Sequence, residues 1–466
     1  MTSQPPQPIE SGNQIPLFLF TYNCNKRRFI PGVFQSKLLE VLPDQLCTLY
    51  VFGFQEFCTI LDSSFPADAH CQLIEMNQLL QEALEEKYQL PSSIHTVSMH
   101  MMGSIAMIIV TPFASKVGTV RNASSSCGYM YSSLKGGVGT RLAFYPNGRY
   151  DSSGSVELSF ATLHLNAHEG EYYYLQRNQN LHRIIRSLDF GDGYGLVKPK
   201  NHIFILGDLN YRTTKQYNPK SPQSQELLSL MDTSLKANKK GYRQKVEKLV
   251  KEYDEFRVSM RNGEVLQNFA EPKITFPPTY KYHVNTAIFN SKRSPSWCDR
   301  IVYLSTYEEL GHDNLGLTLL KFPGKNSNPE WYQRYLPHTI KYDSIETLLQ
   351  SDHRPVYLNM TIPFQPPESI LSSLSGCLQI LPQGITGEER FDNASQLETL
   401  AMSTDVVSGP TTIYLKPTSL DFIQQQLLRP TSDTIIGYSL WLTHTPKGRV
   451  YLFAILLIVS LGYFFI

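Results

Sequence analysis

The sequence predicts an α/β sandwich whose strand ends line a cleft. Apolar runs of strand length, such as Leu49–Phe54 and His202–Leu206, alternate with segments of helical periodicity, such as Gln72–Tyr88. Several of these runs end in polar residues, so a sheet built from them would carry its polar side chains along one rim.

Strand-like runs recur along the chain, each bounded by polar residues. In chain order, Leu17–Phe20 leads to Asn23, Leu49–Phe54 leads to Glu56, Ser159–Leu163 leads to His164, Asp299 precedes Ile301–Leu304, and Asp352-His353 precedes Val356–Leu358. Gln72–Tyr88 has helical apolar spacing with glutamates opposite, which indicates a helix packed on the sheet. The segment between Gln223 and Met260 predicts helix with a basic face, which we interpret as a solvated surface, with contact to anionic lipid as the alternative.

Composition restricts the possible functions. The 466 residues carry a formal net charge of only +1, which argues against a nucleic-acid enzyme that relies on a broad basic surface. From Phe364 to Lys447 serine, threonine, proline and glutamine are common and periodicity is weak. This predicts a linker that is largely irregular, with patches of local order.

Two short segments carry the strongest functional signal. Gly207-Asp208-Leu209-Asn210 follows a buried-type strand, and Ser351-Asp352-His353 precedes another. A strand that ends in Asp-x-Asn delivers a carboxylate and an amide to the rim of a sheet, and Asp-His can complete a polar cluster there. The combination suits hydrolysis of a phosphate ester. Either segment alone is also typical of an ordinary turn.

Longer versions of these segments resemble the inositol polyphosphate 5-phosphatase family. They are Gly-Asp-Leu-Asn-Tyr-Arg at 207–212, Pro-Ser-Trp-Cys-Asp-Arg at 295–300 and Ser-Asp-His-Arg-Pro at 351–355. The resemblance, which runs from about Phe18 to Ile362, implies a deoxyribonuclease I-like, four-layer sandwich of two packed mixed β-sheets flanked by helices. The expected organisation is a flexible N-terminus (1–14), a catalytic domain (15–364), the linker (365–449) and a C-terminal segment (450–466).

The resemblance also implies roles for the rim residues. Asp208 would orient and deprotonate the attacking water, and Asn210 would hold a scissile phosphate oxygen. His353 and His164 would donate to charge that develops on the phosphoryl oxygens, and Asp299 would orient His353.

The implied cofactor is Mg²⁺, which suits a sparse carboxylate site that keeps several waters. Glu56 is the expected ligand, Asn23 would help on the same side, and Asp352 would contribute to a second metal position.

Positive charge is expected around the phosphates that are held but not cleaved. By resemblance, Tyr280, Lys281 and Arg293 surround the 4-phosphate with Lys292 nearby, and Lys135, His168 and Arg177 are the further residues expected at the substrate. The chain departs from the family pattern at Ser291, where a lysine is common, at Ser133-Leu134, which replace Gly-Asn, at Tyr22, which replaces tryptophan, and at Asn180-Leu181, which replace Asp-Tyr. None of these changes removes an expected catalytic group.

The expected function is Mg²⁺-dependent hydrolysis of the 5-phosphate of phosphatidylinositol 4,5-bisphosphate by a monomer. The alternatives are a broader inositol-phosphate 5-phosphatase, a nuclease of the same superfamily, and a non-catalytic lipid-binding adaptor. The near-neutral charge and Tyr280-Lys281 disfavour the nuclease, and the complete catalytic set disfavours the adaptor. The partner would be a phosphoinositide in a membrane and not nucleic acid, with Tyr172–Tyr174 and Met130-Tyr131 in partial contact with the lipid interface.

Val450–Ile466 is uncharged and apolar on every side, with Lys447 and Arg449 just before it. As a helix it would span roughly 25 Å, close to the thickness of a thin bilayer. We therefore expect a tail anchor in the endoplasmic reticulum membrane, with the catalytic domain facing the cytosol. The alternative is a buried C-terminal helix, which normally keeps a polar face.

Overall fold

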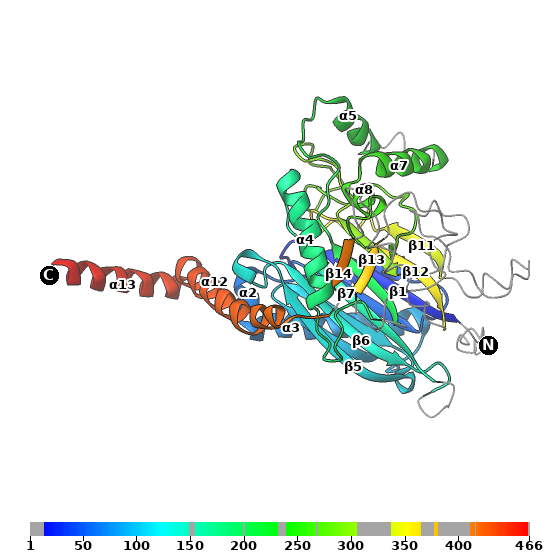
Figure 1. Cartoon of the computed structure of the whole chain (residues 1–466), viewed down its shortest axis with the longest axis horizontal. Helices are drawn as coiled ribbons and strands as arrows, with labels where there is room; N and C mark the ends of the chain where they lie inside the picture. Colours follow the sequence, from blue (N-terminus) through cyan, green and yellow to red (C-terminus); the bar gives the residue numbers. More distant parts are fainter. Residues whose placement is uncertain are drawn as a thin grey trace, which may run out of the picture.

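The computed structural model describes two six-stranded sheets that pack face to face (Figure 1). It describes residues 14–148, 154–198, 201–231, 239–266, 269–304, 337–364, 377–380, 411–414 and 416–464. The first sheet has the order β11 (His338–Ser344), β12 (Val356–Pro363), β1 (Gln14–Asn23), β2 (Leu49–Gln55), β4 (Ile105–Thr111), β3 (His95–Met102). The second has the order β5 (Val117–Ser126), β6 (Gly136–Phe144), β7 (Val156–His164), β8 (Asn201–Asp208), β10 (Asp299–Leu304), β9 (Phe269–Ala270).

Both sheets are mixed. Strands β1 and β2 are parallel, as are β7 and β8, whereas β12 runs antiparallel to β1 and β10 antiparallel to β8. The carboxyl ends of β1, β2, β7 and β8 and the amino ends of β10 and β12 provide the rim residues named above. The predicted fold class is confirmed.

The period-2 alternation of β1 explains how the layers form. Leu17 and Leu19 point into the core between the sheets, whereas Phe18 and Phe20 point to the outer face of the first sheet. Helices α1 (Pro31–Leu39) and α3 (Pro66–Tyr88) cover that outer face, and α3 contains the predicted helix Gln72–Tyr88. Helices α4 (Glu171–Ser187) and α8 (Glu255–Arg261) cover the outer face of the second sheet. The segment predicted as helix between Gln223 and Met260 includes α5 (Pro222–Leu228), η3 (Ser229–Met231), α7 (Lys239–Tyr253) and α8.

The structure differs from the predicted irregular linker in its C-terminal part. A short two-stranded sheet joins β13 (Cys377–Ile380) and β14 (Thr411–Tyr414). Thr418–His444 then forms α11 (Ser419–Ile423), a π-helical turn (η4, Gln424–Leu428) and α12 (Arg429–His444). This segment lies against the two-sheet domain near α2 (Ile60–Ser64), with the Phe65 and Tyr438 rings in edge contact and their centroids 6.2 Å apart (Figure 1).

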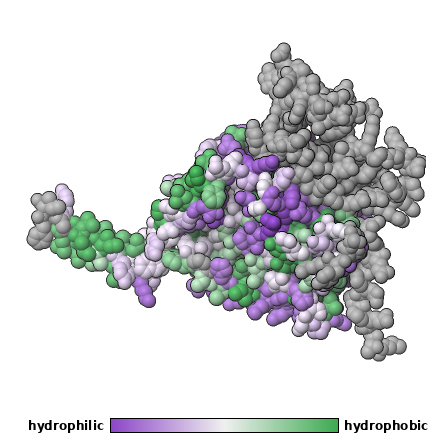
Figure 2. All heavy atoms as spheres, turned by 60° about the horizontal axis from the view of Figure 1, so that its bottom comes forward, coloured by the Kyte–Doolittle hydropathy of each residue, from purple (hydrophilic) through white to green (hydrophobic). Residues whose placement is uncertain are grey.

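Helix α13 (Pro446–Phe464) extends away from the domain (Figure 1). Its apolar side chains are exposed and form the hydrophobic projection in Figure 2; they include Val450, Tyr451, Phe453, Leu456, Ile458 and Val459. Of the helices in the described residues, none combines the length and the apolar character needed to cross a membrane. The last two residues of the predicted anchor, 465 and 466, lie outside the described part of the chain.

Candidate active site

Strand register brings four rim residues of the second sheet into one row. Gly136 pairs with His164, His164 with Asp208, and Asp208 with Asp299. Lys135 immediately precedes Gly136, so its side chain starts from the same row. Neighbouring strands lie about 4.8 Å apart, so residues far apart in sequence become adjacent here.

The first sheet supplies its residues to the same rim. The Asn23 side chain at the end of β1 donates from Nδ2 to Asp208 Oδ2 at 2.8 Å, which joins the two sheets. Glu56, one residue beyond β2, lies with Oε1 4.0 Å from His164 Nε2. Ser351 donates from Oγ to the Asn23 carbonyl at 2.7 Å, which fixes the turn that carries Asp352 and His353.

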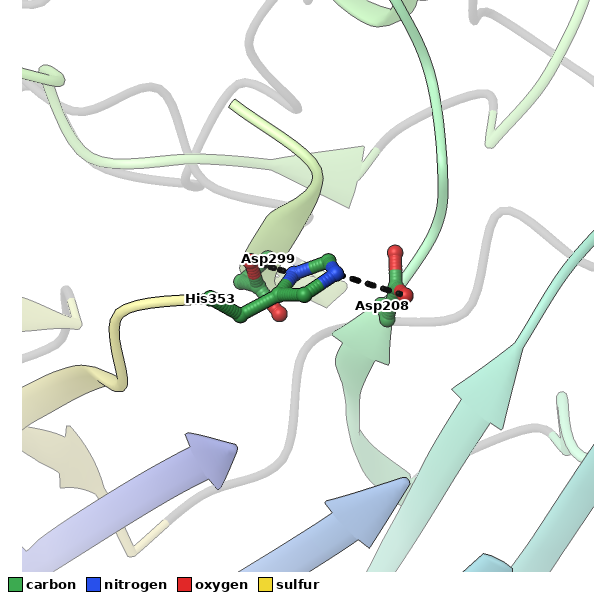
Figure 3. Close-up of side chains that lie close together, drawn as sticks. All are labelled: Asp208, Asp299 and His353. Atoms are coloured by element: carbon green, nitrogen blue, oxygen red, sulfur yellow. Dashed lines mark hydrogen bonds and ion pairs between the residues drawn. The ribbon is translucent and has the colours of Figure 1, made fainter. Parts of the chain in front are cut away.

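His353 lies between two buried carboxylates (Figure 3). Its Nδ1 is 2.9 Å from Asp299 Oδ2, and its Nε2 is 3.9 Å from Asp208 Oδ2. Burial lowers the pKa of His353, but Asp299 and then Asp208 outweigh this and raise the pKa to about 9. The imidazole is therefore protonated at neutral pH and can donate from Nε2.

Asp208 is held in place by its neighbours. Gly207 (φ +146°) passes so close to β7 that a Cβ would lie 2.1 Å from the Leu163 carbonyl oxygen, which explains the glycine before this aspartate. Burial raises the pKa of Asp208, but His353 and His164 outweigh it and hold that pKa below its ordinary value. The carboxylate is thus ionised and able to accept a proton.

Asn210 (φ +57°) turns back onto the same aspartate, because its backbone N–H donates to Asp208 Oδ1 at 3.0 Å. Its side chain donates from Nδ2 to the Leu165 carbonyl at 3.1 Å and accepts from Arg212. Sequence reasoning missed Arg212, whose guanidinium also stacks on the Tyr280 ring at 4.3 Å. Its place two residues after Asn210 in the Gly-Asp-Leu-Asn-Tyr-Arg segment was the available signal.

His164 and Lys135 meet at the rim. His164 Nε2 contacts Lys135 Nζ, and His164 Nε2 also lies 3.4 Å from Asp208 Oδ2. Burial, and then the Lys135 charge, lower the pKa of His164. His164 is therefore neutral, whereas His353 is cationic. Only His353 carries the second ring proton of an imidazolium.

The rim residues fit a divalent cation. Ligand atoms of Asp208, Asp299 and His353 lie within 4.8 Å of one another, a possible metal-binding grouping that the sequence did not predict. Hard cations prefer carboxylate and amide oxygens, and a protonated imidazole cannot coordinate. Glu56, whose Oε1 lies by His164, and Asn23, whose amide contacts Asp208, carry oxygens that suit a hard cation better than His353 does.

The residues expected around the uncleaved phosphate lie beside this cluster. The Tyr280 ring packs on His353 at 4.7 Å, and Lys281 Nζ pairs with Asp352 Oδ2 at 2.7 Å. Lys292 and Arg293 are exposed on the adjoining turn, near enough for the Arg293 charge to act on Lys281.

Arg177, which was expected at the substrate, is placed differently. Arg177 is fully buried and donates to Glu255 Oε2 at 2.8 Å and to the His168 carbonyl at 2.8 Å. The guanidinium thus holds the loop after His164 and does not project from the rim. His168 itself is exposed, with its ring 5.1 Å from the Tyr173 ring.

A buried row of carboxylates and histidines at the rim of this fold defines a hydrolase site of the metal-assisted class. The chain belongs to the Endonuclease/Exonuclease/phosphatase family 2, which matches residues 20–359. The resemblance to inositol polyphosphate 5-phosphatases is confirmed at the level of the family, through distant relatives.

Two of these relatives illustrate the distance. Synaptojanin-2 of Rattus norvegicus is 27% identical over 285 residues, which cover 58% of this chain and 17% of that protein. Inositol-1,4,5-trisphosphate 5-phosphatase 1 of Schizosaccharomyces pombe is 26% identical over 353 residues, covering 74% of this chain and 27% of that protein. This chain therefore matches less than a third of the length of either relative.

A solved structure shares the fold. It is the inositol polyphosphate 5-phosphatase domain of SPsynaptojanin in complex with inositol (1,4)-bisphosphate and calcium ion. The TM-score is 0.54 at 24% identity, and the similarity covers 75% of this chain and 85% of that one.

Proposed function

We propose that this chain removes the 5-phosphate of phosphatidylinositol 4,5-bisphosphate with Mg²⁺ as cofactor, giving phosphatidylinositol 4-phosphate and phosphate. The observation that carries the proposal is the buried Asp208–His353–Asp299 group with Tyr280 and Lys281 beside it. The relatives support the reaction class, since one is named an inositol-trisphosphate 5-phosphatase and the solved domain holds an inositol bisphosphate.

The charge state of each residue determines its role in the reaction. Asp208 is ionised, so it orients a water and accepts its proton as the oxygen attacks phosphorus. The bond from phosphorus to the inositol 5-oxygen breaks in the same displacement, and that oxygen takes up a proton from solvent. The His353 imidazolium donates from Nε2 to the phosphoryl oxygens as charge develops, and Asp299 holds the ring in that orientation. Glu56 and Asn23 would hold Mg²⁺, with Asp352 at a second metal position, and the cation would offset the negative charge of the phosphate.

The direct test is phosphate release from a panel of phosphoinositides and soluble inositol phosphates, with Mg²⁺ and with excess chelator. We expect release from the 4,5-bisphosphate lipid that the chelator abolishes. Nicking of duplex DNA without phosphate release would favour the nuclease alternative, and release from every substrate at equal rates would favour the broader phosphatase.

Replacing Lys281 or Arg293 with alanine should weaken action on the 4,5-bisphosphate lipid far more than on a 5-phosphorylated headgroup that lacks the 4-phosphate. A charge-assisted contact matters only when its phosphate is present, and one such contact is worth about tenfold to a hundredfold in kcat/KM. Comparing kcat/KM on the two substrates measures this. Lys251→Ala, an exposed lysine of α7, is the control, and equal losses on both substrates would show that Lys281 and Arg293 serve general electrostatics.

We further propose that the C-terminal helix anchors the protein to the endoplasmic reticulum membrane with the catalytic domain in the cytosol. The exposed apolar side chains along α13 support the proposal, because a solvated helix would not normally present them on every side. The basic residues Lys447 and Arg449 before the apolar stretch agree with a cytosolic boundary.

Removing residues 450–466 should release the protein to the soluble fraction while leaving hydrolysis of a detergent-dispersed substrate intact, since α13 makes no part of the rim. Fractionation of cells that express the two forms measures the first effect and phosphate release the second. Residues 359–361, Asn-Met-Thr, form a glycosylation sequon, so glycosylation at Asn359 in the full-length protein would place the domain in the lumen and contradict the orientation.

A further inference from the structure

The segment Thr418–His444, here called the strap, is fixed to the catalytic domain by ion pairs and hydrogen bonds. Arg186 of α4 donates to both carboxylate oxygens of Asp421, at 2.9 and 2.7 Å. Arg429 donates to Ser124 Oγ at 2.7 Å. The strap begins with a capping box between Thr418 and Asp421, so its start is defined locally as well.

The strap lies on the loop that carries Lys135, here called the Lys135 loop (Cys127–Lys135). Two consecutive residues in this loop, Met130 (φ +51°) and Tyr131 (φ +63°), adopt the left-handed conformation that non-glycine residues rarely populate. Such a backbone persists only where the surroundings hold it. The loop closes on itself through the Cys127 N–H and the Lys135 carbonyl at 2.8 Å.

Three strap side chains bond to the backbone of the loop and its start. Gln425 Oε1 accepts from the Ser126 N–H at 3.0 Å, and Asp433 Oδ1 accepts from the Ser133 N–H at 2.7 Å. Ser432 donates from Oγ to the Met130 carbonyl at 2.6 Å. These hydrogen bonds therefore lie before Met130-Tyr131 (at Ser126), after it (at Ser133) and on Met130 itself.

The opposite side of the loop is also tightly packed. A Cβ at Gly103 would lie 2.5 Å from the Ser133 carbonyl oxygen, so the loop is pressed between that turn and the strap. Ser133 and Leu134 replace the Gly-Asn of the family pattern. The Asp433 contact stabilises the backbone at this departure.

We propose that Gln425, Ser432 and Asp433 are positioning residues, which hold the Lys135 loop so that the Lys135 ammonium reaches the rim beside His164. The inference rests on the proposed function for its catalytic consequence, but the position of Lys135 can be measured independently. It makes the strap part of the active-site support.

The test compares the full-length wild type in detergent with Asp433→Ala, Asp433→Asn and Gln425→Ala. Asparagine keeps an oxygen that can accept from the Ser133 N–H, so Asp433→Asn should behave as wild type. Gln426→Ala is the matched control, because this exposed neighbour undergoes the same substitution as Gln425. Hydrogen–deuterium exchange of the loop, acylation of Lys135 relative to the exposed Lys251, and kcat and KM on detergent-dispersed phosphatidylinositol 4,5-bisphosphate are measured for each.

For the two alanine variants we expect about fivefold faster exchange in the Lys135 loop, increased acylation of Lys135, and about a tenfold fall in kcat or kcat/KM. Unchanged exchange and acylation in both would overturn the positioning role, as would equal effects in Gln426→Ala. Faster exchange with unchanged turnover in an active enzyme would also overturn it. A wild type without turnover would refute the proposed function, and exchange and acylation would then decide the strap inference alone.

Discussion

Replacing Asp208 with asparagine is expected to lower kcat by about 10²–10³-fold, because it removes the group that orients the water and accepts its proton. Asparagine has nearly the same shape, and its one oxygen can still accept from either the Asn23 amide, which meets Oδ2 at 2.8 Å, or the Asn210 N–H, which meets Oδ1 at 3.0 Å, but not from both. The strand that precedes it, β8, keeps its apolar packing. Asn210→Ala should also abolish most turnover, since it removes the amide expected to hold a scissile oxygen.

The measurement is kcat on the 4,5-bisphosphate lipid, with thermal unfolding as the check on folding. Asp44→Asn makes the same substitution at a fully exposed side chain and should leave both quantities unchanged. Near-normal turnover in purified, folded Asp208→Asn would remove Asp208 from its assigned role. If Asp208→Asn both unfolded at a lower temperature and lost turnover, its kcat would be compared with that of the wild type at a temperature where the variant is folded.

The rim could be predicted because its residues stand at strand boundaries. Asp208 ends β8, Asp299 begins β10 and His164 ends β7, and each boundary is visible as a change from an apolar run to polar residues. Strand order and register were not visible, yet they determine that these three residues lie side by side. The motif resemblance supplied the grouping that local pattern could not.

Other features depend on long-range pairing that a single sequence does not reveal. Arg177 was expected at the substrate, but its partner Glu255 is far along the chain and withdraws the guanidinium into the interior. The strap was expected to be irregular because its sequence lacks a wide apolar face. Its attachment depends instead on polar contacts such as Arg186 with Asp421. Weak hydrophobic periodicity is therefore a poor guide to a helix that docks through hydrogen bonds.

Replacing Asp299 with asparagine should lower turnover by about 10²-fold or more and shift its dependence on pH. Burial lowers the pKa of His353, whereas Asp299 is the largest influence that raises it, to about 9. In the wild type the donating imidazolium is present below that pKa, so kcat should fall as pH rises through about 9. Without the Asp299 charge the pKa of His353 falls, and the alkaline loss of activity should move to lower pH.

A pH profile of kcat between neutral pH and pH 10 measures both effects. Asp192→Asn is the control, because Asp192 pairs with Arg141 at 2.7 Å outside the rim and should leave the alkaline limb in place. Asparagine can still accept from His353 Nδ1, so the ring keeps its orientation and the shift reports charge. If Asp299→Asn lowered kcat at every pH without moving the limb, Asp299 would act by orientation alone, and His353 would not be the group whose deprotonation ends activity.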